Sequence, residues 1–240
     1  MIPLRGIPEL EKGDDLAALI VEAARAAELE DGDVVVVAQK AVSKVEGRVV
    51  DLSGVEPSER ALELAAETDP RRLEIILREA REVLRSRPPL VIAETQHGFV
   101  CASAGVDASN AKGPDTLVLL PVDPDASAAL LRERIGALTG TEVGVVVSDS
   151  FGRAWRLGTT DVALGVAGIT ALLDLDGQRD SLGYELHATQ IAVADEIASA
   201  AQLVMGKTDG VPAAVVRGLS LQGDGSGRDL VMPRARDLFR

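Results

Sequence analysis

One segment of the chain places a carboxylate, a hydroxyl and two guanidinium groups within a few residues of one another. Asp149 and Ser150 follow the β-branched run 145–147 after Ser148, and Arg153 and Arg156 come soon after them. Oxygen ligands at the end of a buried strand can hold Mg²⁺, and arginine can form bidentate pairs with phosphate. The segment favours a phosphate-handling site with Asp149, Arg153 and Arg156 as catalytic residues. A capped strand followed by two solvated arginines explains the same pattern equally well.

Two other segments could bring further polar groups to this site. Asp107 and Asn110 lie in a loop of small and polar residues, where Asp107 could bind the same metal and Asn110 could contact a base or ribose. Lys40 and Lys44 follow the β-branched run 34–37 at a spacing that puts both on one face of a strand or helix, so they are candidate phosphate contacts. An Asx-rich turn and a lysine-rich strand end are the alternative interpretations.

Two short motifs resemble known catalytic signatures, but the residues around each motif do not match the structure that the signature requires. Residues 206–208 match the end of a phosphate-binding loop, but the first glycine is missing and a helix is expected before them. Residues 148–152 approximate a nucleophile elbow, but the segment that follows is a poor helix former. A serine hydrolase that uses Ser150 with His187 and either Asp174 or Asp176 remains a rival interpretation.

The composition limits what such a site can be. Lys and Arg total 25 against 38 Asp and Glu, which gives a net charge of −13 and disfavours nucleic-acid binding. One cysteine, Cys101, and two histidines leave hard cations such as Mg²⁺ or Mn²⁺ as the default metals. No apolar run approaches the roughly 18 residues of a membrane span, and no secretion signal is evident. We expect a cytoplasmic protein without membrane or nucleic-acid partners.

The elements that must position these residues follow from hydrophobic periodicity and turn signals. We expect strands at 2–4, 34–37, 90–93, 99–102, 117–120, 142–147 and 213–216, and one at 42–50 paired with 34–37. We expect helices at 14–27, at 57–85 with a break at Asp69-Pro70, at 124–138 and at 191–205. Residues 152–190 are expected to be rich in loops.

The order of these elements predicts the fold class. Strands and helices alternate without a clean βαβ rhythm, which favours an α+β fold of mixed sheets with surface helices over a doubly wound sheet. No stretch has the composition of a linker, so we expect a single domain over residues 1–240 with a helical lobe at 57–87. Within it we expect two interleaved subdomains.

Several segments together resemble one family, the ligases that add L-glutamate to the deazaflavin coenzyme F-420-0. The segments that carry the resemblance are GIPEL at 6–10, GDDL at 13–16, GDVVVV at 32–37, VSKVEGR at 42–48, AGVDASN at 104–110, LPVDPDA at 120–126, SDSFGRAWR at 148–156, AVADEI at 192–197 and VVRG at 215–218. This many matches in order is more specific than any short motif, and they span essentially the whole chain. They imply an F-420 ligase-type fold.

The resemblance implies GTP-dependent ligation of L-glutamate to the lactyl carboxylate of coenzyme F-420-0 through an acyl phosphate. It leaves open whether further glutamates are then added through γ-linkages. It implies Mg²⁺ or Mn²⁺, two ions per subunit, a monovalent cation such as K⁺, and a homodimer. Asp107 and Asp149 would hold one metal, and Ser150 would bind the second. Ser150 stands where Thr is common, and Lys207 stands where some relatives carry an amide or an acid near the second metal.

The same resemblance implies a set of residues in contact with the guanine nucleotide: Ile7, Pro8, Glu9, Leu10, Gln39, Lys44 and Asn110. The chemistry is consistent with the residues present, because phosphorylation activates a carboxylate and the dispersed charge of a phosphoryl group is stabilised by metals, lysine and arginine. Two alternatives from other classes stay open: the serine hydrolase built on Ser150, and a nucleotide-binding module without catalysis.

Overall fold

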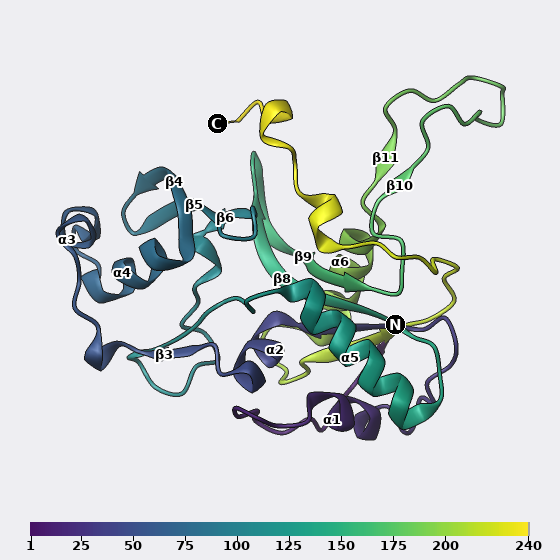
Figure 1. Ribbon diagram of the computed structural model, residues 1–240, viewed down its shortest axis with the longest axis horizontal. Helices are drawn as coiled ribbons and strands as arrows, with labels where there is room; N and C mark the ends of the chain where they lie inside the picture. The colour runs from purple at the N-terminus through teal and green to yellow at the C-terminus, as the bar shows by residue number, and fades with distance from the viewer. Residues whose placement is uncertain (240) are drawn as a thin grey trace.

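The computed structural model describes residues 1–239 and has a mixed main sheet with a smaller lobe beside it (Figure 1). The main sheet has five strands in the order β1-β12-β2-β8-β9. Their bounds are Ile2–Pro3 for β1, Ala213–Val216 for β12, Val34–Ala38 for β2, Gly144–Arg153 for β8 and Arg156–Ala167 for β9. The predicted α+β class is confirmed.

Strands β2 and β8 form the parallel centre of the main sheet. They pair in register from Val34 with Gly144 to Ala38 with Ser148. Helices cover both faces of these strands. The bounds of these helices are Leu16–Ala23 for α1 and Pro124–Thr139 for α5 on one face, and Val193–Met205 for α6 on the other. Burial on both faces explains why an unbroken valine run is stable here, as the sequence predicted for 34–37.

The smaller lobe is inserted in the chain between the centre of the main sheet and α5. It comprises Val49–Asp51 (β3), Glu59–Ala65 (α3), Pro70–Glu79 (α4), Ala80–Arg87 (β4), Leu90–Thr95 (β5), Val100–Ala102 (β6) and Thr116–Val118 (β7). Strands β3 and β7 form one sheet, and β4, β5 and β6 form another. The lobe has its own apolar core, which includes Leu73, Ile76 and Leu117. The chain leaves the main sheet, builds the lobe and returns, so the two predicted subdomains are interleaved.

The lobe is only partly helical. The prediction that a helix continues to residue 85 is wrong, because helix α4 ends at Glu79. Residues 80–87 form β4, which pairs antiparallel with β5. Arginine, glutamate and leucine in this stretch have good helix propensity, but pairing with β5 overrides that weak preference. The predicted break at Asp69-Pro70 is confirmed, because the Asp69 carboxylate accepts a hydrogen bond from the Arg71 backbone N–H at 2.9 Å and caps α4.

The prediction of a strand at 42–50 is also wrong, because Gln39–Glu46 form helix α2 directly after β2. The helix ends at Gly47, whose φ of 74° lies in the left-handed region that favours glycine. Ala41 and Val42 pack into the main core. Only residues 49–51 are extended, and they pair with β7 rather than with β2. The packing of one helical face into the core therefore outweighs the strand propensity of the β-branched residues in this stretch.

Strands β8 and β9 form a long antiparallel hairpin where loops were expected, so the prediction for 152–190 is wrong over residues 156–167. The turn places Trp155 at a φ of 58°. Asp149 and Ser150 therefore lie within a strand and not at its end. The parallel pairing with β2 nevertheless stops at Ser148, so both residues lie just beyond the carboxyl end of β2.

The remaining elements are short. An arm that projects from the main sheet is closed at its base by β10 and β11 (Figure 1). The bounds of the short elements are Leu173–Asp174 for β10, Gln190–Ile191 for β11, and Leu52–Gly54, Ser103–Gly105, Gly227–Leu230 and Arg234–Arg236 for single 3₁₀ turns. Helix α1 is shorter than the 14–27 expected, and Asp15 caps it. Over residues 1–239, the helices are too short or too polar to cross a bilayer.

Helix α5 approaches the main sheet so closely that residue 165 must be glycine. A Cβ atom there would lie 2.0 Å from the Pro124 carbonyl oxygen and 2.9 Å from the Asp125 backbone nitrogen. We expect Gly165→Ala to lower the free energy of unfolding by about 3 kcal/mol, because only backbone could yield. Chemical denaturation measures this. Gly54→Ala is the control, because a Cβ there meets nothing within 4 Å. Equal stability of the two variants would contradict the close approach.

Candidate active site

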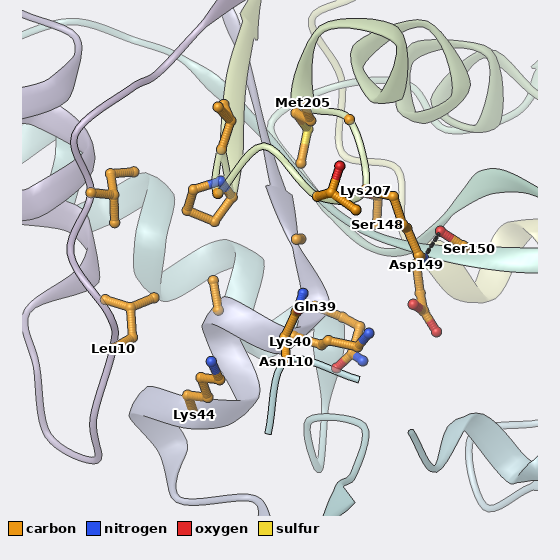
Figure 2. Close-up of a pocket in the computed structure, with 18 of the residues that line it drawn as sticks. Leu10, Gln39, Lys40, Lys44, Asn110, Ser148, Asp149, Ser150, Met205 and Lys207 are labelled. Atoms are coloured by element: carbon orange, nitrogen blue, oxygen red, sulfur yellow. Dashed lines mark hydrogen bonds between the residues drawn. The ribbon is translucent and has the colours of Figure 1, made fainter. Parts of the chain in front are cut away.

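A cavity of about 560 Å³ lies at the carboxyl end of β2, between the N-terminal loop, helix α2 and the loop after α6 (Figure 2). Its wall brings together eleven residues that the sequence analysis named: Ile7, Pro8, Glu9, Leu10, Gln39, Lys40, Lys44, Asn110, Asp149, Ser150 and Lys207. Asp107, Arg153 and Arg156 are not in this wall. The carboxyl end of a parallel strand is a common place for ligands, and helices and loops that converge there can hold a phosphorylated molecule.

The end of the cavity near the N-terminal loop combines apolar groups with an ion pair. Ile7, Pro8 and Leu10 contribute apolar surface. Glu9 Oε1 accepts a hydrogen bond from Lys44 Nζ at 2.5 Å. The Lys44 side chain is 12% exposed and that of Glu9 is 58% exposed, so α2 holds the lysine while the carboxylate stays accessible. This end suits a flat heterocycle that has hydrogen-bond donors on one edge.

Helix α2 positions Lys40 one turn before Lys44, so both lysines face the same side. Lys40 Nζ lies 2.6 Å from Asp107 Oδ2 and 2.5 Å from Ser109 Oγ. Burial acts to raise the pKa of Asp107, but hydrogen bonds from Lys40 and Ser109 outweigh it and hold that pKa below its usual range. Asp107 is therefore an ionised carboxylate outside the cavity wall, paired with Lys40, which is part of the wall.

Asp149 occupies the end of the cavity opposite Leu10 and Lys44 (Figure 2). Burial raises the pKa of Asp149 to about 6, and the charge of Asp161 adds to the rise. The backbone N–H of Ser150 and the charges of Lys40 and Lys207 act in the opposite direction. The net rise means that the surrounding positive charge does not fully compensate this carboxylate. A bound cation would stabilise its ionised form.

The Ser150 hydroxyl is engaged by three side chains. It donates to Asp161 Oδ1 at 2.6 Å, and it accepts from Lys207 Nζ at 2.6 Å and from Gln202 Nε2 at 3.4 Å. Asp161 stands opposite Ser150 on β9 and also accepts from Ser148 Oγ at 3.2 Å. A serine hydroxyl has one hydrogen and two lone pairs, so these contacts use its whole hydrogen-bonding capacity.

Gln39 presents an unsatisfied donor at the cavity. The residue is 1% exposed, and its Oε1 accepts from Ser43 Oγ at 2.8 Å. Of the buried side-chain nitrogen and oxygen atoms in residues 1–239, only Gln39 Nε2 has no hydrogen-bond partner. A buried donor without a partner costs about 1–3 kcal/mol, which an acceptor on a bound ligand would recover. Gln39 is therefore suited to contact a carbonyl or phosphate oxygen.

The two arginines of the 148–156 segment are not brought to the cavity. Arg153 and Arg156 pair with each other at the exposed tip of the β8–β9 hairpin, and Arg153 contacts the Leu157 carbonyl oxygen at 3.4 Å. The sequence placed them near Asp149 because they follow it closely. An extended strand carries them away from it, since each residue adds about 3.3 Å.

The geometry does not support a serine hydrolase. His187 lies on the arm, where its ring centroid is 6.3 Å from that of Tyr184, and it is not in the cavity wall. Ser150 is bonded to Asp161, Lys207 and Gln202 instead. Nucleophilic serine needs an adjacent base to accept its proton, and a lysine ammonium that donates to the hydroxyl is the reverse arrangement.

The donors near Lys40 fit one hard divalent cation. Lys40 Nζ lies 2.6 Å from Asp107 Oδ2, and its charge also acts on Asp149, which makes these two carboxylates the candidate ligands of a divalent cation. Within residues 1–239, no group of three or more His, Cys, Asp or Glu is arranged to hold a metal. Two carboxylates completed by water and substrate phosphates are a usual environment for Mg²⁺. The surroundings of Ser150 do not fit a second such ion, because its hydroxyl is fully used and an ammonium group is next to it.

Sequence reasoning missed Asp161, Gln202 and most of the loop after α6. Asp161 begins an otherwise apolar run and Gln202 interrupts an apolar helix face, and neither pattern indicates a site without the pairing of β8 with β9. Residues 206–208 follow a helix, as expected, and so are not a phosphate-binding loop of the usual kind. They nevertheless line the cavity.

The chain is similar to known proteins over nearly its whole length. The family model described as F420-0:Gamma-glutamyl ligase matches residues 6–218. A coenzyme F420:L-glutamate ligase of Methanocaldococcus jannaschii is 47% identical over 217 residues, which cover 88% of this chain and 86% of the relative. Ligases of the same name from Methanothermobacter thermautotrophicus and Archaeoglobus fulgidus are each 44% identical, cover 100% of this chain, and are themselves covered to 98% and 96%.

Proposed function

The chain belongs to the F420-0:gamma-glutamyl ligase family, and from this premise we propose that it ligates L-glutamate to the lactyl carboxylate of coenzyme F-420-0 with GTP as the phosphoryl donor. The observation that supports the GTP-dependent reaction is the single cavity that runs from the Glu9–Lys44 pair to Asp149. One end offers an apolar surface with an accessible carboxylate, which suits a guanine base. The other end offers lysines and a carboxylate, which suits phosphates and their metal ion.

The proposed reaction consists of two transfers. In the first, a carboxylate oxygen of the acceptor attacks the γ-phosphorus of GTP, the bond to the leaving GDP oxygen breaks, and an acyl phosphate forms. In the second, the amine of glutamate attacks the acyl carbon, the C–O bond breaks, inorganic phosphate leaves, and the nitrogen loses one proton to solvent. Both transfers spread negative charge over phosphate oxygens, and fixed cations in a partly desolvated site stabilise that charge.

The residues of the chain have distinct tasks in this proposal. Lys40 on α2 binds phosphate oxygens, and the Gln39 amide donates to an oxygen of the nucleotide. Lys44 holds the Glu9 carboxylate at the base end of the cavity. Asn110, with a donor and an acceptor, contacts the ribose or base. A divalent ion, Mg²⁺ or Mn²⁺, held by Asp107 and Asp149 would polarise the transferred phosphoryl group when bound. With that ion in place, Lys40 would no longer need to neutralise Asp107 and would contact phosphate.

The decisive test is mass spectrometry of F-420-0 after incubation with the protein, GTP, Mn²⁺ and glutamate. The expected product carries the added mass of one glutamate residue or more, with GDP and phosphate formed in equal amounts. Nucleotide binding without any glutamate adduct would favour a non-catalytic nucleotide-binding module. Formation of the adduct with ATP but not with GTP would overturn the assignment of the donor.

Glu9 is expected to select the base. Its carboxylate can accept hydrogen bonds from the N1–H and N2–H₂ groups of guanine, which adenine cannot supply, and Lys44 holds it in place. We expect Glu9→Gln to lower the ratio of kcat/KM for GTP over that for ATP by about tenfold, or ~1.4 kcal/mol, because an amide presents only one acceptor. Glu22→Gln, on the exposed face of α1, is the control. An unchanged ratio in Glu9→Gln would mean that the base is recognised elsewhere.

We extend the proposal to a homodimer. Large apolar side chains are exposed at the hairpin tip, where Trp155 is 84% and Leu157 99% exposed, and on the arm, where Leu182 is 93% exposed. Apolar groups of this size gathered on projecting segments are typical of surfaces that a second copy covers. Arg153 and Arg156 would then lie in the interface. Light scattering of the purified protein measures the mass, and a monomer at all concentrations would refute the homodimer.

A further inference from the structure

The second cation position implied by the family resemblance is filled differently in this chain. Lys207, in the loop after α6, donates to Ser150 Oγ at 2.6 Å. Its positive charge also acts on Asp149. The ammonium group therefore lies next to the hydroxyl that the resemblance assigned to a metal, at the same end of the cavity as Asp149 (Figure 2).

The hydrogen-bond pattern leaves Ser150 unable to ligate a metal ion while these contacts persist. A ligand must offer a free lone pair, and the two lone pairs of this oxygen face Lys207 and Gln202 while its proton goes to Asp161. A divalent ion at this place would also lie close to a fixed positive charge, and the repulsion between like charges would weaken its binding.

The surrounding acidic groups explain why a cation is needed at this position at all. Asp161 is 6% exposed and lies directly across the sheet from Ser150, and its charge acts on Asp149. Two carboxylates close together at the edge of a cavity that receives phosphate would repel the substrate. Lys207 brings a positive charge to them on a flexible four-carbon stem, anchored by one hydrogen bond.

We propose, on the basis of the proposed ligase function, that Lys207 is a further catalytic residue whose ammonium group replaces the second divalent ion and contacts a phosphate oxygen of the nucleotide. The chain then uses one divalent ion, at Asp107 and Asp149. Lys207 forms no covalent bond and keeps its proton throughout the reaction. Its role is to supply a fixed positive charge where charge develops on the transferred group.

Mn²⁺ titration of the full chain with saturating GDP, followed by electron paramagnetic resonance, tests the proposal. We expect one Mn²⁺ per wild-type chain. Lys207→Gln removes the charge and adds an amide oxygen, so it should bind two. Lys207→Met removes the charge without adding an oxygen ligand, so it should bind one. Lys12→Gln changes an exposed lysine outside the cavity and should match the wild type.

Turnover provides the second measurement. We expect Lys207→Met to lose about 100-fold in kcat at every Mn²⁺ concentration, because one stabilising charge is missing. Lys207→Gln should lose as much at low Mn²⁺ and recover at high Mn²⁺, as the second ion enters. Two Mn²⁺ per wild-type chain, or full activity of Lys207→Met, would overturn the proposal. The ion count needs no turnover, so a wild-type chain that makes no glutamate adduct refutes the ligase function separately.

Discussion

Asp149→Asn is expected to lower ligation by at least about 1000-fold while the protein stays folded. The carboxylate lies at the phosphate end of the cavity, near the cations Lys40 and Lys207, and it is one of the two carboxylates that fit a divalent ion. The amide has the same shape but cannot balance the charge of that ion, so the stabilisation of the transferred phosphoryl group is lost. Glutamate-adduct formation under single-turnover conditions measures the effect.

The control for this substitution must separate loss of chemistry from loss of structure. Asp195→Asn is a suitable match, because Asp195 is also a half-buried carboxylate whose pKa burial raises, and it lies outside the cavity. We expect Asp195→Asn to retain activity, and both variants to keep the wild-type circular dichroism spectrum. Burial already disfavours the ionised form of Asp149, so the neutral amide should not weaken the fold. An Asp149→Asn variant with most of its metal-dependent turnover would refute the metal role.

Asp107→Asn is expected to lower turnover by about 100-fold with GTP and ATP alike. Asp107 is 2.6 Å from Lys40 and is not part of the cavity wall that holds Glu9, so its contribution should pass through the metal and the phosphates. Losing one charged ligand should also raise the Mn²⁺ concentration needed for half-maximal rate by about 10-fold to 100-fold, since ligand charge determines much of the affinity for a hard cation.

Steady-state rates against Mn²⁺ concentration, with each nucleotide, test this expectation. Asp115→Asn is the control, because Asp115 is an exposed carboxylate of the same lobe and pairs with Arg71. If the ratio of GTP to ATP turnover changed while the Mn²⁺ requirement stayed the same, Asp107 would have to be assigned to base recognition and not to metal binding. An Asp107→Asn variant with a normal rate and a normal Mn²⁺ requirement would place the ion elsewhere.

Some elements follow from local physics that can be read along the chain. The unbroken valine run at 34–37 indicates burial on both faces of a sheet, and β2 has that environment. Asp123 followed by Pro124 marks a helix start, and α5 begins there. Residue type and family resemblance single out the segments around residues 7–10, 39–44, 107–110 and 149–150, and neither signal depends on contacts between distant segments.

Contacts between distant segments decided the rest. Residues 80–87 and 156–167 form strands because partner strands supply their hydrogen bonds, and the local pattern of hydrophobic residues does not indicate that pairing. That same pairing carried Arg153 and Arg156 away from the cavity and brought Asp161 opposite Ser150. The loop after α6 then placed Lys207 on the hydroxyl of Ser150, across 57 residues of chain. Residue type and spacing are local properties, whereas the charge that faces Asp149 depends on strand register and loop path, which only the folded chain determines.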